Sequence, residues 1–222
     1  MKACPPLPRA GLYALTPDSL SETSHLVARV LAAIAGGAVL VQYRDKPANA
    51  KLRETRALAL VEACHPRGVP LLVNDEFNLA VEVGAAGVHL GRDDGDLPMA
   101  RTLLGAARII GVSCYDSLAL AREAVAAGAD YVAFGSFYAS ATKPHAVRCP
   151  LDVLRQARQE LAVPIVAIGG ITAENAPPLL AAGAGLLAVI GALFDGPDVT
   201  AAARAFAAPL TFSPSRNNRK SL

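Results

Sequence analysis

The residues of this sequence best suited to chemistry are polar side chains that directly follow short apolar runs. One run ends in Gln42, Arg44 and Lys46, and because side chains alternate along a strand, these three share one direction. Another run ends in Asn74 and Asp75. Two cations beside an acid are suited to binding a phosphorylated anion together with a divalent cation. A single charged strand end would be interpreted as an ordinary solvated loop. The prediction of a binding site depends on polar side chains that follow several apolar runs.

A second acid follows the next apolar run. His89 lies in that run and Asp94 comes shortly after it. Carboxylates from neighbouring strands can share Mg²⁺, which keeps waters and takes phosphate oxygens as its remaining ligands. We therefore predict a magnesium site formed by Asp75 and Asp94. The alternatives at this point are that Asp75 caps a helix and that Asp94 is a solvated loop residue.

Hydroxyl groups and glycines follow the later runs. Ser113 supplies a small hydroxyl donor, although a lone serine at such a place is more commonly a helix cap. Residues 135–144 combine several hydroxyls with Lys143, which suits either an anionic ligand or a polar surface loop. Gly170 and Gly191 follow two further runs. Barrels often bind a phosphate at such loops through backbone N–H groups, where a Cβ would block the approach.

A repeated unit indicates how these positions are brought together. Four times, an alanine-rich helical pattern is followed by a glycine and a short apolar run, in residues 33–41, 82–90, 126–132 and 181–187. A glycine at this place can take the left-handed conformation that ends a helix. Near-continuous apolar runs are typical of parallel strands buried on both faces. Eight such runs begin near Gly11, Ala38, Pro70, Gly87, Arg108, Tyr131, Pro164 and Gly185.

These alternating units predict an α/β fold, a single (β/α)8 TIM barrel over residues 1–210. An open doubly wound sheet is the alternative, but eight units with short connections favour closure. Thr172 is expected to cap the helix after the seventh strand, which Pro177 and Pro178 should keep short or bent. Residues 211–222 are polar and basic, and we expect a disordered tail there.

Composition excludes several other classes. The 222 residues are 53% hydrophobic, which argues against disorder, yet no apolar stretch is long and clean enough to span a bilayer. A net charge of +2 does not indicate nucleic-acid binding. Four widely spaced cysteines without a CxxC pair are typical of reduced thiols, and we assign none a catalytic role. We expect a cytoplasmic protein with small-molecule partners and no nucleic-acid or membrane partner.

Seven segments in order, each at an expected strand end, resemble the thiamine phosphate synthase family. They are VQYRDK, LLVNDEFNLA, GVHLGRDD, GVSCYD, FGSFYASATKP, AIGGIT and AVIGALF, and the resemblance runs from Gly11 to Phe194. It implies a Mg²⁺-dependent transferase in thiamine biosynthesis. The diphosphate of 4-amino-5-hydroxymethyl-2-methylpyrimidine would react with a thiazole phosphate, giving thiamine phosphate and diphosphate.

The resemblance also implies roles for individual residues. The pyrimidine diphosphate would be held by Gln42, Arg44, Lys46, Asn74, Ser113 and Lys143. The thiazole phosphate would be held by Ser140, Ala141, Thr142, Gly170, Ile190 and Gly191. Arg44, Lys46 and Lys143 would assist catalysis by neutralising the departing diphosphate, with Mg²⁺ on Asp75 and Asp94. We favour a dissociative path, which needs no strong base, so His89 is expected to be structural or supporting, with a proton shuttle left open.

Three positions depart from the family pattern. Arg92 replaces a glutamine, Ser140 replaces a threonine and Gly191 replaces a serine. None of them removes a predicted metal ligand or diphosphate contact. Two alternatives are a thiazole tautomerase-like barrel and a non-catalytic phosphate-binding barrel, neither of which needs both acids and all the cations. The sequence leaves the oligomeric state open, a homo-oligomer included.

Overall fold

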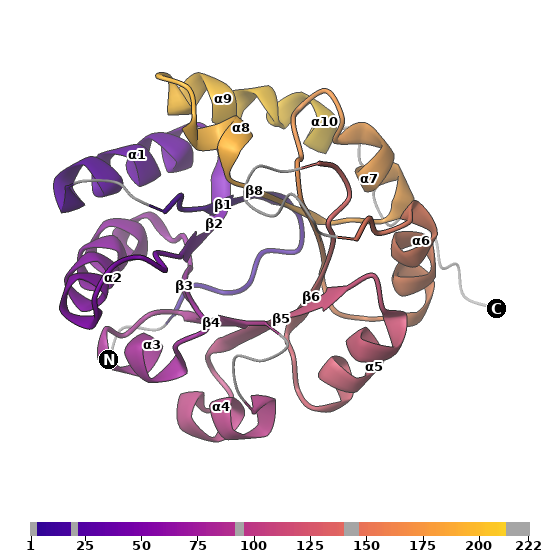
Figure 1. The fold of residues 1–222 in the computed structure, drawn as a ribbon, viewed down its shortest axis with the longest axis horizontal. Coiled ribbons are helices and arrows are strands. Elements are labelled where there is room, and N and C mark those ends of the chain that lie inside the picture. Colours follow the sequence, from indigo (N-terminus) through magenta and orange to yellow (C-terminus); the bar gives the residue numbers. More distant parts are fainter. Residues whose placement is uncertain (1–3, 19–21, 92–95, 140–146, 212–222) are drawn as a thin grey trace.

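The computed structural model describes residues 4–18, 22–91, 96–139 and 147–211. Within them, eight parallel strands form a closed barrel in chain order, with β8 paired to β1 (Figure 1). The strands are β1 (Gly11–Leu15), β2 (Ala38–Tyr43), β3 (Leu71–Asn74), β4 (Gly87–Leu90), β5 (Ile109–Tyr115), β6 (Tyr131–Phe134), β7 (Ile165–Ile168) and β8 (Leu186–Val189). Each begins at or one residue after its predicted start, and the predicted barrel is confirmed.

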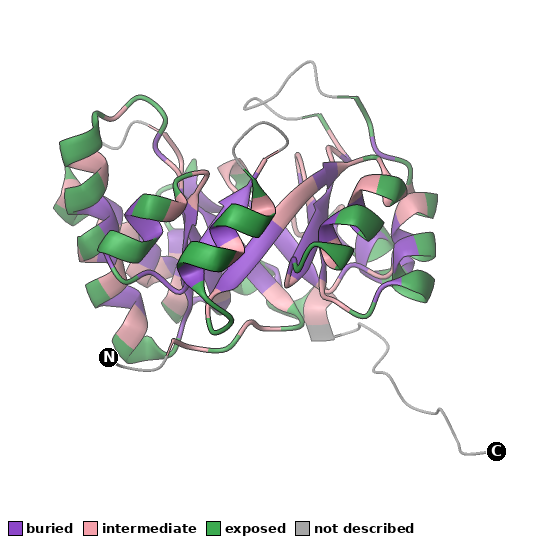
Figure 2. Cartoon of the chain, turned by 90° about the horizontal axis from the view of Figure 1, so that it is seen from below, coloured by how far each residue is buried: buried purple, intermediate pink, exposed green. Residues whose placement is uncertain are grey.

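Helices surround the barrel and expose their outward faces (Figure 2). They are α1 (Thr23–Ala35), α2 (Ala50–Cys64), the 3-10 helix η1 (His65–Arg67), α3 (Phe77–Glu82), α4 (Leu97–Leu104), α5 (Leu118–Ala126), α6 (Leu151–Glu160), α7 (Pro177–Ala182), α8 (Gly191–Phe194), α9 (Val199–Ala205) and α10 (Ala207–Thr211). Helix α7 is short, as its two leading prolines predict. None of the helices in the described part of the chain combines the length and apolar character needed to cross a membrane.

The prediction that Thr172 caps α7 is wrong. Helix α7 begins at Pro177, and Ala176 occupies its N-cap position without a side-chain hydrogen bond. Thr172 instead forms a turn with Asn175, whose Oδ1 accepts from the Thr172 N–H at 2.8 Å. The Asn175 side-chain amide also donates to the Gly170 carbonyl at 3.0 Å. The polar pair therefore braces the loop after β7, since a short polar side chain can bond backbone groups in a turn as well as at a helix start.

The repeated glycines end helices as the sequence predicts. Gly37, Gly84, Gly128 and Gly183 have φ values of 111°, 70°, 100° and 116°. A side chain with a Cβ rarely adopts these angles, whereas glycine does so at little cost. The chain thus leaves each of these helices in the direction needed to enter the next strand.

Side chains along the strands alternate between two cores, because successive side chains point to opposite faces. Outward residues such as Val41 and Val73 pack with the helices in the larger core. Inward residues such as Leu40 and Leu72 fill the barrel interior, and Leu7 of the N-terminal segment packs against this inner cluster. Polar residues at the C-terminal ends of the strands thus occupy positions already set by the apolar alternation.

The ring of helices closes where α9 meets α1 (Figure 1). The Thr200 hydroxyl donates to the Ala32 carbonyl at 3.1 Å. Arg29 of α1 donates to the carbonyl of Phe194 and, at 3.2 Å, to that of Gly196. Phe206 is 1% exposed and completes the core beyond α9. The C-terminal helices therefore bind the end of the barrel to its beginning.

Candidate active site

The C-terminal end of β2 places its predicted site residues at two depths. Gln42 points into the barrel, is 2% exposed, and its Nε2 donates to the Tyr13 hydroxyl at 2.5 Å. Arg44 forms an ion pair with Asp18 of the loop after β1. The other oxygen of Asp18 accepts from the Lys46 N–H at 3.1 Å. The loop after β1 therefore holds the backbone and side chains of the predicted diphosphate-binding segment, a role for Asp18 that sequence reasoning missed.

Asp45 lies between the two cations in the chain but faces the helix layer. It forms an ion pair with Arg56 of α2, and the two side chains are 5% and 4% exposed. The Tyr43 hydroxyl also donates to this carboxylate at 3.3 Å. A charge so buried is stable only when it is paired. The pair anchors the turn after β2, so that Arg44 and Lys46 stay on the side of the barrel mouth, the opening at the C-terminal ends of the strands.

Asp75 follows β3 and is brought beside Lys46, whose Nζ lies 3.5 Å from Asp75 Oδ2. Its φ is 64°, and its N–H donates to the His89 carbonyl at 2.8 Å. A non-glycine residue at positive φ costs free energy and is found preferentially at functional sites. Glu76, not Asp75, occupies the N-cap position of α3, so the helix-cap alternative is not supported.

Inside the mouth, polar side chains from neighbouring strands meet. Asn74 of β3 is in register with His89 of β4. The His89 ring contacts Ser113 Oγ through Nε2 at 2.8 Å and the Tyr131 hydroxyl through Nδ1 at 2.7 Å. The Tyr131 hydroxyl lies 2.9 Å from that of Tyr13. Together with Gln42, these residues form a buried polar cluster.

Two members of this cluster were not found from the sequence. Tyr13 and Tyr131 sit inside apolar strands, and the only available signal was a hydroxyl at an inward-facing position. Burial raises the pKa of Tyr13 above its usual value of 10, and burial with the neighbouring Tyr13 does the same for Tyr131. Both phenols therefore stay protonated and able to donate.

Ser113 does not cap a helix. The N-cap of α5 is Ser117, whose Oγ accepts from the Leu120 N–H at 3.3 Å. Ser113 is partly exposed on the inward face of β5, in contact with His89. The hydroxyl is thus available both to the interior cluster and to the mouth.

The loops after β6 and β7 pack on one another. Gly170 has φ 61°, and a Cβ built there would lie 2.2 Å from the Ala139 carbonyl oxygen. The Tyr138 N–H donates to the Gly169 carbonyl at 3.0 Å, and its hydroxyl donates to the Asn175 carbonyl at 2.8 Å. Sequence reasoning attributed glycine here to a close ligand approach. The structure shows a close approach between two loops, which also requires it.

Strand β8 leads directly into α8. Ile190 is at the N-cap position and Gly191 is the first helical residue. The first N–H groups of a helix have no partner within it, so they can bind an anion. A Cβ on Gly191 would lie 2.7 Å from Asp195 Oδ2. The serine usual in the family would therefore require the Asp195 side chain to move.

Six residues named from the sequence lie outside the described residues: Arg92, Asp94, Ser140, Ala141, Thr142 and Lys143. Among the residues that are described, no group of three or more His, Cys, Asp or Glu side chains is arranged to hold a metal. Of the two predicted magnesium ligands, the structure thus describes Asp75 alone.

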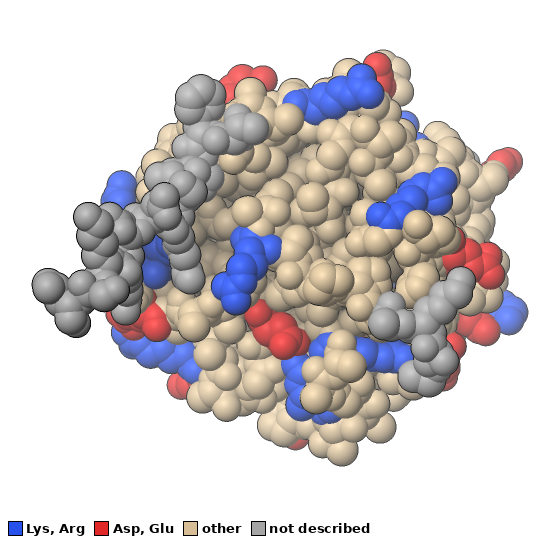
Figure 3. All heavy atoms as spheres, turned by 180° about the vertical axis from the view of Figure 1, so that it is seen from behind, with Lys and Arg blue, Asp and Glu red and all other residues tan. Residues whose placement is uncertain are grey.

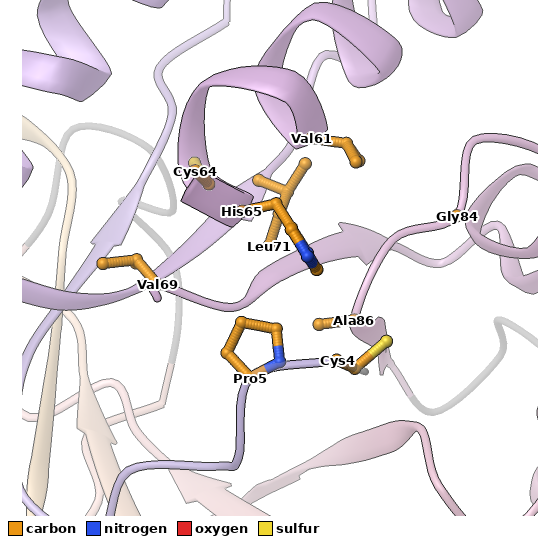
Figure 4. A pocket seen from close by; sticks show the side chains of 9 residues that line it. All are labelled: Cys4, Pro5, Val61, Cys64, His65, Val69, Leu71, Gly84 and Ala86. Carbon is orange, nitrogen blue, oxygen red and sulfur yellow. The ribbon is translucent and has the colours of Figure 1, made fainter. Parts of the chain in front are cut away.

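Within the part of the chain that the structure describes, cavities lie beside the barrel, and two of them are considered next. One, of about 10 Å³, is lined at the N-terminal strand ends by Cys4, Leu71, Ala86, the His65 side chain and neighbouring apolar residues (Figure 4). That volume holds about one water molecule, so it cannot take a substrate. The other, of about 240 Å³, lies between β4, β5, α4 and α5 and borders Ser113. Of the predicted cations, the two that the structure describes, Arg44 and Lys46, line neither cavity.

Charges of both signs lie on the face of the molecule seen from behind the view of Figure 1. On the face shown in Figure 3, Lys and Arg side chains are interspersed with Asp and Glu. This agrees with a net charge of only +2.

Comparisons with known proteins identify the relatives of this chain. A family model described as thiamine monophosphate synthase matches residues 12–193. A thiamine-phosphate synthase of Thiobacillus denitrificans is 55% identical over 193 residues, which cover 87% of this chain and 91% of that one. Another, of Nitrosospira multiformis, is 51% identical over 209 residues, which cover 93% and 89%.

Solved structures share the fold. Thiamine phosphate pyrophosphorylase from Pyrococcus furiosus matches with a TM-score of 0.80 at 30% identity, covering 91% of this chain and 96% of that chain. A 3-hexulose-6-phosphate synthase matches with a TM-score of 0.71 at 20% identity, covering 89% and 99%. At that lower identity the likeness concerns the barrel alone.

Proposed function

The chain belongs to the thiamine monophosphate synthase family and is a transferase with thiamine-phosphate synthase activity, and from this premise we propose how its barrel mouth performs the transfer. The observation that carries the proposal is that Lys46 and Asp75, from the ends of two adjacent strands, lie 3.5 Å apart, while Asp18 holds the Arg44 side chain and the Lys46 N–H. The pyrimidine diphosphate supplies the electrophilic methylene carbon, the thiazole phosphate nitrogen attacks it, and diphosphate leaves.

The diphosphate binds over β2 to β6 in this proposal. Arg44 presents a planar fork of N–H donors that matches two phosphate oxygens, and Lys46 adds a compact charge. Lys143, outside the described residues, is proposed as a third cation. Negative charge grows on the diphosphate as it leaves, and fixed cations lower the free energy of that transition state. The aminopyrimidine stabilises the cationic methylene, so no covalent nucleophile is required.

We place Mg²⁺ at Asp75, with Asp94 as the second carboxylate. Asp75 fits such a role because it is an oxygen donor, is 22% exposed at the mouth, and has its backbone held in a left-handed conformation beside Lys46. When bound, Mg²⁺ supplies positive charge to the diphosphate oxygens. Asn74 and Gln42 then orient the pyrimidine from the inner side.

The thiazole phosphate is proposed to bind where the loops after β6, β7 and β8 meet. Support comes from the packing of the Gly170 loop on the loop after β6 and from the start of α8 at Gly191. Ser140, Ala141 and Thr142 would contribute hydroxyl and N–H donors, and Ile190 would set the direction of the chain. Backbone N–H groups suit a monophosphate that must be held without being activated.

The rival functions account for fewer observations. A tautomerase-like or non-catalytic barrel has no evident need for a strained Asp75 beside a lysine, and the similar proteins cited above are synthases. We also propose that the protein works in the cytoplasm, because its four cysteines are free and lie far apart in the sequence.

The test is direct product analysis. The protein is incubated with both phosphorylated precursors and Mg²⁺, and thiamine phosphate and diphosphate are measured by chromatography. We expect equal amounts of the two products, each dependent on both precursors. Folded protein that forms neither product from authentic precursors would contradict the proposal.

A further inference from the structure

The buried polar cluster is a single chain of hydrogen-bonding groups that crosses the barrel interior. It runs from Gln42 to Tyr13, then to Tyr131, His89 and Ser113. Successive polar atoms are 2.5, 2.9, 2.7 and 2.8 Å apart. Both end residues are among those proposed to hold the pyrimidine diphosphate, whereas the three middle residues are 1%, 0% and 8% exposed.

The direction of this chain follows from counting donors. The Gln42 amide nitrogen only donates, so Tyr13 accepts from it, and each phenol has one proton to give. If the Tyr13 hydroxyl donates a hydrogen bond to the Tyr131 oxygen, then the Tyr131 hydroxyl donates its own hydrogen bond to His89 Nδ1. The proton of the imidazole must then be on Nε2, which donates to Ser113. In the opposite order, the buried Tyr13 proton would have no acceptor in the chain, which is unfavourable.

One glycine makes the chain geometrically feasible. Gly111 of β5 is in register with His89 on one side and with Tyr131 on the other. A Cβ at Gly111 would lie 1.9 Å from Tyr131 Cζ and 2.3 Å from its hydroxyl oxygen. The Tyr131 ring therefore lies over the strand at this gap and stacks on His89, with ring centroids 5.6 Å apart and planes 22° apart.

We propose that Tyr131 is a positioning residue for the transfer reaction: through a one-way hydrogen-bond chain it fixes neutral His89 as the Nε2–H tautomer and leaves the Ser113 hydroxyl proton directed at the pyrimidine diphosphate. The role of Ser113 as a ligand of that substrate rests on the proposed function. His89 in this arrangement shuttles no proton. His89 accepts a hydrogen bond on its interior side and donates one on its mouth side, so the donor-to-acceptor order set inside the barrel continues to the barrel mouth.

The first test needs no catalysis. The ¹⁵N shifts and couplings of the His89 ring are measured in the wild-type protein and in Tyr131→Phe, which keeps the ring and removes the hydroxyl. We expect Nε2–H in the wild type and a shifted or mixed tautomer in the variant. Tyr43→Phe is the matched control, because it removes a buried hydroxyl on the outer side of the barrel, where the strands face the helices. Wild-type protein with the proton on Nδ1 would overturn the proposal.

The second test is a double-mutant cycle, in which the kinetics of the transfer reaction are compared between the wild-type protein, the two single variants and the double variant. Tyr131→Phe should raise KM for the pyrimidine diphosphate by roughly tenfold, the effect of about one hydrogen bond, and leave KM for the thiazole phosphate unchanged. The double variant Ser113→Ala/Tyr131→Phe should be no worse than Ser113→Ala alone, because Tyr131 acts through Ser113. Additive effects, or wild-type kinetics in Tyr131→Phe, would contradict it. If the wild type makes no product, the proposed function fails while the tautomer measurement still decides the chain.

Discussion

At the scale of single residues, the cations of the mouth are held by acids before any substrate is considered. Arg44 is paired with Asp18, and Lys46 lies near Asp75. These partners keep long, flexible side chains in place, which reduces the entropy lost when a ligand binds. Under the proposed function, a diphosphate that enters would compete with Asp18 for Arg44, and the acids would restrict binding to ligands of high negative charge.

Replacing Asp75 with asparagine should impair metal use. The change removes a carboxylate charge and keeps the shape, so we expect a roughly ten- to hundredfold lower kcat and a higher Mg²⁺ requirement, in line with the loss of one charge-assisted contact. Titrating activity against Mg²⁺ measures both. Glu76→Gln is the matched control, because that acid pairs with Arg53 instead. Wild-type rate and Mg²⁺ dependence in Asp75→Asn would exclude the assignment.

Two buried thiols should be inert in the folded protein. Burial raises the pKa of Cys64 and of Cys114 from 9.0 to about 12. Both therefore remain protonated at neutral pH and should react with a thiol reagent only after denaturation. Because the folded state holds these protons more tightly, their contribution to stability is complete below pH 9 and lost as pH rises to about 12. Timed labelling with mass spectrometry, and unfolding curves across that pH range, check both statements.

Sequence reasoning found residues at strand ends better than residues inside the barrel. Arg44 and Asp75 were identifiable because charge directly after an apolar run is conspicuous. Tyr13 and Tyr131 were not, because a tyrosine in an apolar strand is ordinarily a packing residue. Asp18 was missed because its role depends on the approach of two loops, which no spacing along the chain encodes.

At the scale of elements, the turn between β2 and α2 depends on a buried ion pair. Asp45 and Arg56 lie 11 residues apart and bind the strand end to the helix. Mouth and helix layer are thereby linked at the segment that carries Arg44. A change on the outer side of the barrel can consequently alter the inner site without touching a ligand.

Arg56→Met should destabilise the protein by about 3–5 kcal/mol, because the charge of Asp45 stays buried without its partner. Adding Asp45→Asn should recover part of this loss. Chemical denaturation measures the free energy of unfolding in each variant. The exposed pair Lys51–Glu54 is the control, and its loss should cost at most about 0.5 kcal/mol. Equal losses at the two pairs would contradict the anchoring role.

Element positions were predictable to within one residue for the strand starts, because burial on both faces leaves a continuous apolar run. Helix starts were less so. Thr172 has the side chain of an N-cap, but the prolines at 177 and 178 can begin a helix unaided, so α7 starts later. Local side-chain preference competes with backbone geometry there, and only the folded loop shows which prevails.

For the whole molecule, closure of the helix ring depends on the last helices. Phe206→Ala removes a large side chain from the core beyond α9 and should cost about 3–5 kcal/mol of stability. Thermal unfolding measures this loss, and Leu58→Ala, at an exposed position on α2, is the control. We expect KM values to remain unchanged below the unfolding temperature. A large change in KM without a loss of stability would show that this region serves the site instead.

The tyrosine pair inside the barrel also makes the protein its own optical probe. The sequence has five tyrosines and no tryptophan, so intrinsic emission comes almost entirely from phenols. Two of them, Tyr13 and Tyr131, have ring centroids 6.1 Å apart in an edge-to-face arrangement, and they join Gln42 to His89. A pyrimidine seated against this chain would quench their fluorescence. We therefore expect occupancy of the mouth to be measurable in real time on unlabelled protein, and the part of the change that is lost in Tyr131→Phe reports on this pair.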